Sequence, residues 1–300
     1  MQADGLIEKD AAMIPRSWLF IPGDAPAKIA KAAGSGADAV IFDLEDSVAL
    51  SRKNEARKLV AIALGHSERE NFPALWVRIN PLASGLALDD LAAVIPAAPA
   101  GIVLPKPDSA ADVSKLSHYL DAFEAAAGIS IGSTKILPIS TETPASLFGL
   151  ASYGIAGPRL AGLTWGAEDL PAAIGARSGR TEDGLLTDLC RMARSLCLVA
   201  AANAGVPAID TVYPEFRDLA GLRMSATAAR REGFVGMMAI HPSQVAVINE
   251  VMTPSDEEIA FARRVVALFA ADPAAGVFAL DGKMLDQPHL KQARRILAIK

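Results

Sequence analysis

The chain has 300 residues, of which 51% are hydrophobic and 21% charged, and its formal net charge is -5. This composition is typical of a well-packed soluble enzyme, and the acidic balance argues against a nucleic-acid surface, which needs clustered Lys and Arg. No apolar run approaches the length of a membrane span, and the first thirteen residues lack the apolar core of a signal peptide. We therefore predict a cytoplasmic protein with neither a nucleic-acid nor a membrane partner.

Short apolar runs alternate with helical patterns along most of the chain. The predicted strands are residues 17–21, 39–44, 75–79, 101–104, 135–139, 160–165, 207–211 and 234–240. The predicted helices include residues 26–34 with Asp24 as cap, 52–64, 109–127, 186–204 and 218–231. Eight apolar strands separated by helices predict an α/β protein of the (β/α)8 TIM-barrel class. No GxGxxG motif follows a strand and no P-loop is present, so a nucleotide-binding doubly wound sheet has less support.

A further helix and an apolar tail follow the eighth predicted unit. Ser255 and Glu258 form the capping-box pattern of a helix over residues 255–271. The tail from residue 276 to 300 still carries apolar residues that need to be buried. We predict a catalytic barrel domain over residues 1–254 and a C-terminal helical extension over residues 255–300 that packs on a neighbouring subunit.

The most informative stretch is the apolar run Val40 to Phe42, which ends in Asp43, Glu45 and Asp46. Functional side chains of an α/β barrel gather at the carboxyl ends of such buried strands. The acidic cluster therefore marks a predicted active-site rim, with Asp43 as a candidate catalytic residue. A solvated loop whose acids face water is the alternative, because acidic residues are common in turns.

Two further acids, Glu142 and Asp169, follow the fifth and sixth predicted strands. Neighbouring barrel strands lie roughly 5 Å apart, so both carboxylates could reach one cation. Mg²⁺ commonly takes one or two protein carboxylates and leaves positions for water and substrate oxygens. The alternative is that each acid caps the following helix, although Glu is a poor helix cap.

Three other polar residues stand at predicted strand ends. Arg78 lies within an apolar strand, where a guanidinium needs a paired partner, and it could donate to a substrate carboxylate or an enolate oxygen. Lys106, between two prolines, is either a second anion contact or an exposed lysine. His241 is either a structural or a catalytic histidine.

Taken together, these segments resemble the citrate lyase β-subunit-like family of the HpcH/HpaI aldolase superfamily. The motifs that carry the resemblance are Arg16 to Gly23, Gly36 to Val48, Arg78 to Asn80, Leu104 to Lys106, Thr141 to Thr143, Gly166 to Leu170 and Gly233 to Gln244. The seven motifs occur in this order, and the resemblance covers nearly the whole chain. One departure follows the glutamate, where many members carry Gly and this chain has Pro144 to Phe148, a bulkier loop that bears on the choice of oxo acid.

The resemblance implies a Mg²⁺-dependent barrel that makes or breaks a carbon–carbon bond between an acyl-CoA and a 2-oxo acid. By position, Glu142 and Asp169 match the metal ligands, and Arg78 matches the arginine that contacts the substrate and the thioester oxygen. Arg16 and Lys31 match positions near the entrance for the thioester carrier, and Lys106 is a further candidate contact to the substrate. The segment Asp281 to Asp286 is similar to a family tail whose aspartate enters a neighbouring active site. Asp286 is therefore the candidate acid/base, in a homo-oligomer such as a trimer or hexamer.

The leading functional hypothesis is a lyase that acts on citryl-, malyl- or citramalyl-CoA. A thioesterase that hydrolyses the same thioesters is a second hypothesis, because it would need the same metal site and only a positioned water. A third is a subunit that works only inside a citrate lyase complex, with a carrier-protein thioester in place of CoA.

Overall fold

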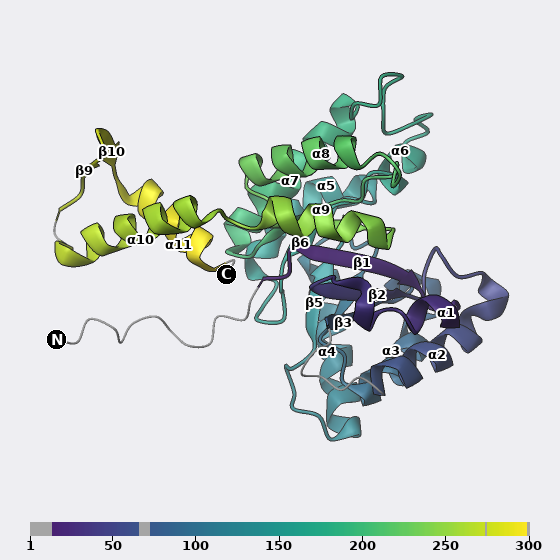
Figure 1. Ribbon diagram of the computed structural model, residues 1–300. Helices are drawn as coiled ribbons and strands as arrows, with labels where there is room; N and C mark the ends of the chain where they lie inside the picture. Colours follow the sequence, from purple (N-terminus) through teal and green to yellow (C-terminus); the bar gives the residue numbers. More distant parts are fainter. Residues whose placement is uncertain (1–13, 66–72, 274, 299–300) are drawn as a thin grey trace.

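Eight parallel strands form the centre of the protein in a computed structural model that describes residues 14–65, 73–273 and 275–298 (Figure 1). The strands are β1 (Ser17–Pro22), β2 (Ala39–Asp43), β3 (Ala74–Arg78), β4 (Gly101–Leu104), β5 (Lys135–Pro138), β6 (Leu163–Thr164), β7 (Ala208–Asp210) and β8 (Gly236–Ala239). Neighbouring strands pair along β1 to β5 and along β6 to β8, and β1 also pairs with β8. Single bridges from Ile136 to Leu160 and from Ile139 to Thr164 join β5 to the β6 segment. The predicted (β/α)8 barrel is thus confirmed.

Helices separate the strands and cover the outside of the barrel. They are α1 (Pro26–Ile29), α2 (Lys53–Gly65), α3 (Ala87–Val94), α4 (Ala110–Ala127), α5 (Pro144–Gly149), α6 (Asp169–Ala173), α7 (Asp188–Ala204), α8 (Leu219–Glu232) and α9 (Pro242–Met252). The helix predicted after Asp24 ends early, at Ile29, and Asp24 does not cap it but pairs with Arg52. The predicted sixth strand shrinks to two residues and a bridge.

Side-chain alternation along the strands separates the barrel interior from the outer layer. In β2, Ala39 and Ile41 belong to an inner cluster with Trp18 and Trp76, whereas Val40 and Phe42 pack outward in the large cluster that includes buried helix residues. Successive strand residues point to opposite faces. Asp43 follows Ile41 by two residues and Arg78 follows Trp76 by two, so both side chains point into the barrel at its carboxyl end.

The C-terminal extension consists of α10 (Asp256–Ala271), the hairpin of β9 (Phe278–Leu280) and β10 (Lys283–Leu285), and α11 (Gln287–Ala298). These elements share a hydrophobic cluster that includes Val265, Phe269 and Leu285. The Ser255 capping box is present, as predicted. Figure 1 places the extension beyond the barrel on the side away from α1, which follows the carboxyl end of β1. The boundary at residue 254 stays a prediction.

Within the described residues, no helix combines the length and the apolar composition needed to cross a bilayer.

Candidate active site at the carboxyl end of the barrel

Asp43 and Arg78 form a doubly hydrogen-bonded ion pair at the mouth of the barrel. They are direct register partners, as the last residues of β2 and β3. The Nε and Nη2 atoms of Arg78 each donate to one oxygen of Asp43 at 2.7 Å. The guanidinium also lies over the ring of Phe20, 4.9 Å from its centroid. A buried charge of this kind is stable only with such a partner, and the pair fixes the plane of the guanidinium.

The remaining acceptor positions of Asp43 are filled by its own loop. Backbone N–H groups of Glu45 and Ser47 donate to its two oxygens at 2.9 and 3.1 Å. Burial alone would raise the pKa of Asp43, but the hydrogen bonds and charge of Arg78 hold it below its ordinary value. Asp43 therefore stays ionised and has no free lone pair for a reacting group, which suits a residue that positions Arg78.

Glu45 and Lys106 continue the network across the mouth. The buried Glu45 carboxylate lies 3.2 Å from Nη1 of Arg78 and 2.5 Å from Nζ of Lys106. Lys106 also approaches Asp46 at 3.3 Å and Asp169 at 3.2 Å. Lys106 is therefore not simply an exposed lysine, which was the alternative prediction. Burial would lower its pKa, but the hydrogen bond and charge of Glu45 raise the pKa above its ordinary value. One ammonium group therefore joins three carboxylates from two different loops, those that follow β2 and β6.

The backbone of Lys106 is also specialised. Its φ of 52° lies in the left-handed region, and it stands between Pro105 and Pro107. A residue with a side chain adopts this conformation only at some cost in energy. The turn aims the N–H of Lys106 at Oε2 of Glu142, which it reaches at 2.7 Å.

Glu142 is a buried carboxyl group with few compensating charges. Burial raises its pKa to about 8, and the negative charges of Glu45 and Asp169 act in the same direction. It does not cap α5, because Thr143 does so. Gly166, which follows β6, packs directly against the Glu142 side chain. A Cβ at this position would lie only 2.8 Å from Cγ of Glu142. The chain thus makes room for Glu142 in a place where its charge is unfavourable unless a cation is bound nearby.

Asp169 is the first residue of α6, and its helix is capped at Glu168 without a side-chain hydrogen bond. Its carboxylate is partly exposed and points toward Lys106. Within the described part of the chain, no three His, Cys, Asp or Glu side chains form a ready-made metal cluster. Glu142 and Asp169 are therefore a two-carboxylate arrangement at one rim of the barrel.

Comparison with known proteins identifies the fold's relatives. A family model described as HpcH/HpaI aldolase/citrate lyase matches residues 16–242. The chain belongs to the HpcH/HpaI aldolase/citrate lyase family. The citrate lyase subunit beta of Haemophilus influenzae is 35% identical over 94% of this chain and 95% of the relative. The (3S)-malyl-CoA thioesterase of Cereibacter sphaeroides strain ATCC 17025 is also 35% identical, over 94% of this chain and 93% of the relative.

A solved structure from this family extends the comparison. It is the protein CitE of Mycobacterium tuberculosis in complex with magnesium, acetoacetate and coenzyme A. The two chains share 36% sequence identity and a TM-score of 0.75, with 97% of this chain and 99% of the other covered. The family resemblance drawn from the sequence motifs is therefore confirmed.

Not all the residues suggested by the family resemblance gather at the mouth. Arg16 precedes β1, so it lies at the amino end of the barrel, where Asp38 and Thr253 accept its hydrogen bonds. This placement opposes the predicted role at the carrier entrance. Lys31 is exposed just after α1, on the carboxyl-end side. The structural interpretation of His241 is favoured, because its ring caps α9 and stacks on Phe216.

Asp286 lies outside the barrel mouth of its own chain. It precedes α11 in the extension, where its carboxylate contacts Nδ1 of His289 at 2.5 Å. In Figure 1, β10 and α11, which flank it, lie on the side of the barrel away from α1. Within one chain, Asp286 is therefore not brought together with Arg78 or Glu142.

Three residues without a predicted role support the acidic loop from behind: Lys53, Asn80 and Asp90. Lys53 is buried and donates to the backbone oxygens of Leu44 and Glu45 at 2.6 and 2.7 Å. Asn80 donates to the same oxygen of Leu44 at 3.0 Å and is itself held by Asp90. The sequence signals for these residues were the place of Asn80 in the Arg78 to Asn80 motif and a lysine, Lys53, at the start of the charged helix.

Proposed function

We propose that the protein is a Mg²⁺-dependent carbon–carbon lyase that cleaves or forms a 3-hydroxyacyl-CoA, with an acyl-CoA and a 2-oxo acid as the other reactants. The proposal rests mainly on the contacts of Lys106 at one rim of the barrel. Its ammonium group binds Asp169 and also Glu45, which in turn contacts Arg78, and its backbone N–H donates to Glu142. The family relationship supports it: the M. tuberculosis structure contains magnesium, an acetoacetate ion and coenzyme A.

The residues present fit a divalent cation. Glu142 is buried beside two other carboxylates, and Gly166 leaves no side chain over it. Glu142 and Asp169 would hold Mg²⁺, and two protein carboxylates leave positions for oxygens of water and substrate. When bound, the ion would polarise the carbonyl of the oxo acid and neutralise the charge that the protein concentrates here.

Arg78 is the proposed donor to the oxygen that becomes negative when the acyl thioester forms its enolate. Asp43 holds two of its nitrogens, so the guanidinium is oriented before substrate arrives and loses little freedom in the reaction. Lys106 would add positive charge to the same rim and contact the substrate carboxylate. We assign Asp43 a positioning role rather than the catalytic role predicted from sequence, because its acceptor positions are filled.

Asp286 is the proposed acid/base, supplied by a neighbouring subunit. It would take a proton from the α-carbon of the acyl thioester in the direction of bond formation, and return it after cleavage. Asp286 lies in the extension, away from the barrel mouth of its own chain, which supports a role in the active site of a neighbouring chain. Such a role requires a homo-oligomer, for example a trimer. Lys31 would lie near the entrance for the thioester carrier.

Two related activities remain as second candidates, because each has a named relative. The Cereibacter protein is a (3S)-malyl-CoA thioesterase, and the Haemophilus protein is a subunit of citrate lyase. We further propose a cytoplasmic location, which suits CoA substrates and the free, buried thiols of Cys190 and Cys197.

The test is product analysis of the purified full-length protein with Mg²⁺ and a panel of malyl-CoA, citramalyl-CoA and citryl-CoA. A lyase releases an acyl-CoA and a 2-oxo acid. Free CoA with an intact hydroxy acid indicates the thioesterase, and activity only with a carrier-protein thioester indicates the complex subunit. The lyase proposal is wrong if no carbon–carbon cleavage accompanies Mg²⁺ addition with any CoA substrate.

A further inference from the structure

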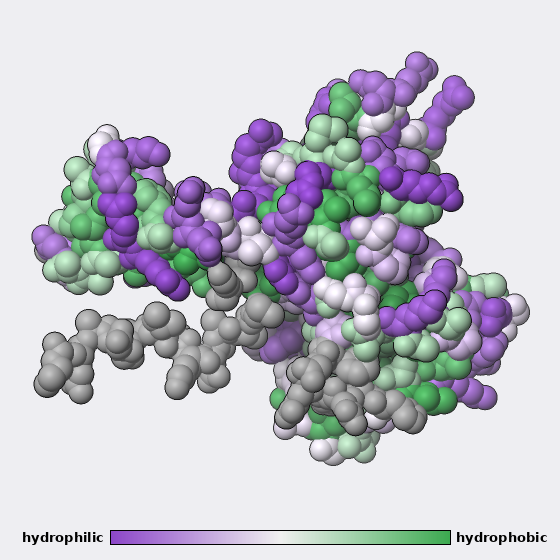
Figure 2. All heavy atoms as spheres, viewed as in Figure 1, coloured by the Kyte–Doolittle hydropathy of each residue, from purple (hydrophilic) through white to green (hydrophobic). Residues whose placement is uncertain are grey.

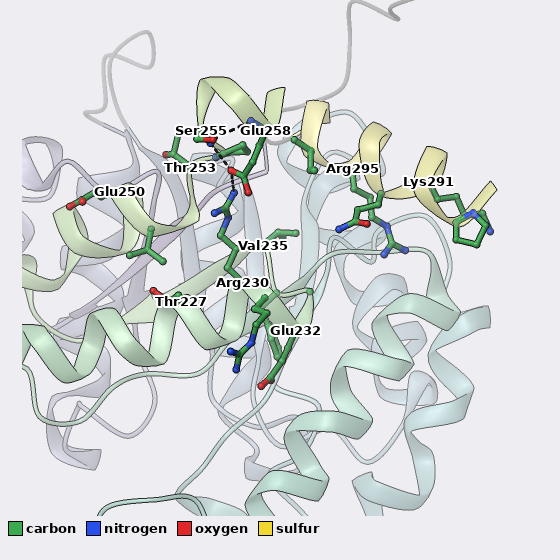
Figure 3. Close-up of a pocket in the computed structure, with 18 of the residues that line it drawn as sticks. Thr227, Arg230, Glu232, Val235, Glu250, Thr253, Ser255, Glu258, Lys291 and Arg295 are labelled. Carbon is green, nitrogen blue, oxygen red and sulfur yellow. Dashed lines mark hydrogen bonds and ion pairs between the residues drawn. The ribbon is translucent and has the colours of Figure 1, made fainter. Parts of the chain in front are cut away.

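A cavity lies at the amino end of the barrel, between the barrel and the C-terminal extension. Its volume is about 1040 Å³, and its walls come from the end of α8, the α9–α10 junction and α11 (Figure 3). In this view Lys291 and Arg295 extend from α11, and Arg230 and Glu232 lie on the α8 side. Known pockets for small molecules span roughly 300–1,000 Å³, so this groove is large enough for a ligand of nucleotide size.

The acidic side chains of this groove are already bound by cations. The pairs are Glu232 with Arg194, Glu250 with Arg223, and Glu258 with Arg230. Arg223 holds Glu250 through two hydrogen bonds, at 2.9 and 2.6 Å. Glu258 is further engaged by the backbone N–H of Ser255 at 2.7 Å. These carboxylates are therefore not available to neutralise additional positive charge.

Three further cations line the same groove: Arg231, Lys291 and Arg295. Among the described residues, none of the three has an ion-pair partner. Lys291 and Arg295 are four residues apart on α11, where like charges share one helix face and repel one another. In a chain whose net charge is -5, this concentration of unpaired positive charge is local to the groove.

We propose that this groove binds a small molecule that carries two or more phosphate groups. Arginine matches phosphate oxygens with parallel hydrogen bonds, and several phosphates would neutralise the three cations together. The groove also has an apolar wall, with Val235, Pro254 and Ile296, on which an organic group could pack. Figure 2 shows hydrophilic side chains gathered on the surface where the extension meets the barrel.

A ligand in this groove would contact both the barrel and the C-terminal extension. The lining of the groove includes Gln287 and Pro288, the first residues of α11, which directly follow Asp286. A phosphate bridge between Arg231 on the barrel side and Lys291 or Arg295 on α11 would hold the extension against its own barrel. The ligand would therefore control the freedom of the segment that carries Asp286.

The first test is calorimetric titration of the metal-free, full-length protein with inorganic tripolyphosphate in the presence of EDTA. Without metal, the two cations of the barrel mouth, Arg78 and Lys106, are already paired with carboxylates, so we expect little binding of this anion there. We expect saturable binding with one site per chain, weakened by added salt. The variant Arg231→Gln/Arg295→Gln should bind about tenfold or more weakly, since it removes two charge-assisted contacts.

The matched control is Lys58→Gln/Arg263→Gln, which removes the same number of charges from exposed positions outside the groove. Its affinity should remain within about twofold of the unmodified protein. Absence of saturable binding, equal affinity of the groove variant, or an equal loss in the control overturns the proposal. Tighter binding of citrate than of tripolyphosphate overturns the assignment to phosphate.

Two further measurements locate the ligand and define its source. Hydrogen exchange should slow at residues 287–296 on addition of tripolyphosphate and stay unchanged around Arg78, whereas the reverse pattern overturns the placement. Tighter binding of ATP than of tripolyphosphate indicates that the apolar wall contacts the organic group, and equal affinity indicates recognition of phosphate alone. Either of these last results supports the site, and neither depends on lyase activity.

Discussion

Arg78 and Asp43 are cross-strand partners whose side chains meet through two 2.7 Å hydrogen bonds at the carboxyl end of the barrel. The pair explains why a charged residue stands in an apolar strand. The same pairing leaves the guanidinium fixed in one plane beneath the loop that carries Glu45, so its donor direction is set by the fold rather than by substrate binding.

Replacement of Arg78 by Ala should lower kcat by about 100-fold or more, because a preorganised donor to a developing negative charge contributes on that scale. Arg78→Lys is the matched comparison, since it keeps the charge but cannot form the two parallel bonds to Asp43. We expect Arg78→Lys to remain well below the unmodified enzyme in a steady-state assay. A loss of only a few fold in both variants would reduce Arg78 to a structural residue.

Lys53 should act as a positioning residue for the acidic loop. Lys53→Met removes two hydrogen bonds from a charged donor, which contribute about 1.5–3 kcal/mol each, although the oxygens of Leu44 and Glu45 keep their bonds from Asn80 and from the N–H of Val48. We expect a lower unfolding midpoint and a reduced kcat with little change in KM. Lys58→Met, on the exposed face of α2, is the control for charge and side-chain size. Equal effects of the two substitutions would contradict the assigned role.

Gly166 tests the space around Glu142. In Gly166→Ala, the new Cβ would lie 2.8 Å from Cγ of Glu142, so the carboxyl must move. Changing a residue that positions a metal ligand typically lowers the affinity for the metal by about 10–100-fold. We expect the Mg²⁺ affinity of Gly166→Ala to fall by that amount. Gly34→Ala, where a Cβ meets nothing within 4 Å, is the control. An unchanged affinity in Gly166→Ala would argue against Glu142 as a ligand.

Asp286 can be tested by subunit complementation. Asp286→Ala should retain its fold and Mg²⁺ binding but lose activity, and Arg78→Ala should also be nearly inactive. If Asp286 acts in a neighbouring active site, mixed oligomers of the two variants contain some sites with both residues intact. Mixing after dissociation should then restore part of the activity. No recovery in oligomers shown to be mixed would mean that Asp286 does not act between chains.

The barrel could be predicted from the sequence because each strand is a short apolar run followed by polar residues at its carboxyl end. Glu142, Asp169, Arg78 and Lys106 share one rim because parallel strands end together. What could not be predicted is the partner of each side chain. That Asp43 binds Arg78 depends on the β2–β3 register, and that Lys106 joins three loops depends on its left-handed backbone.

Two features of the structure differ from what the sequence suggested, and each has a physical reason. Arg16 lies in a motif with family resemblance, but its place before β1 puts it at the opposite end of the strand from Pro22, and Asp38 holds it there. The hairpin in the extension was missed although Asp281 and Gly282 form a two-residue turn in which both have positive φ. Asp-Gly between strand residues is a strong hairpin signal, but the flanking segments have only three residues each.

The acid–base state of Glu142 provides a prediction that couples pH to metal binding. Its pKa is raised to about 8 by burial and by nearby negative charges, from an ordinary value of 4.5. In the metal-free protein the group is therefore protonated near neutral pH. Because the folded state holds this proton more tightly than the unfolded state, its contribution to stability is present below pH 4.5 and is lost as pH rises through about 8.

Mg²⁺ has the opposite preference, because it needs the ionised carboxylate and must displace the proton. Its affinity should rise by up to about tenfold per pH unit below the raised pKa and level off above it. Titrations between pH 6 and 9, in two buffers with different ionisation enthalpies, measure both the affinity and the released proton. Glu142→Gln should bind more weakly and lose this proton release. Constant affinity with no proton release across the range would contradict the proposed ligand role of Glu142.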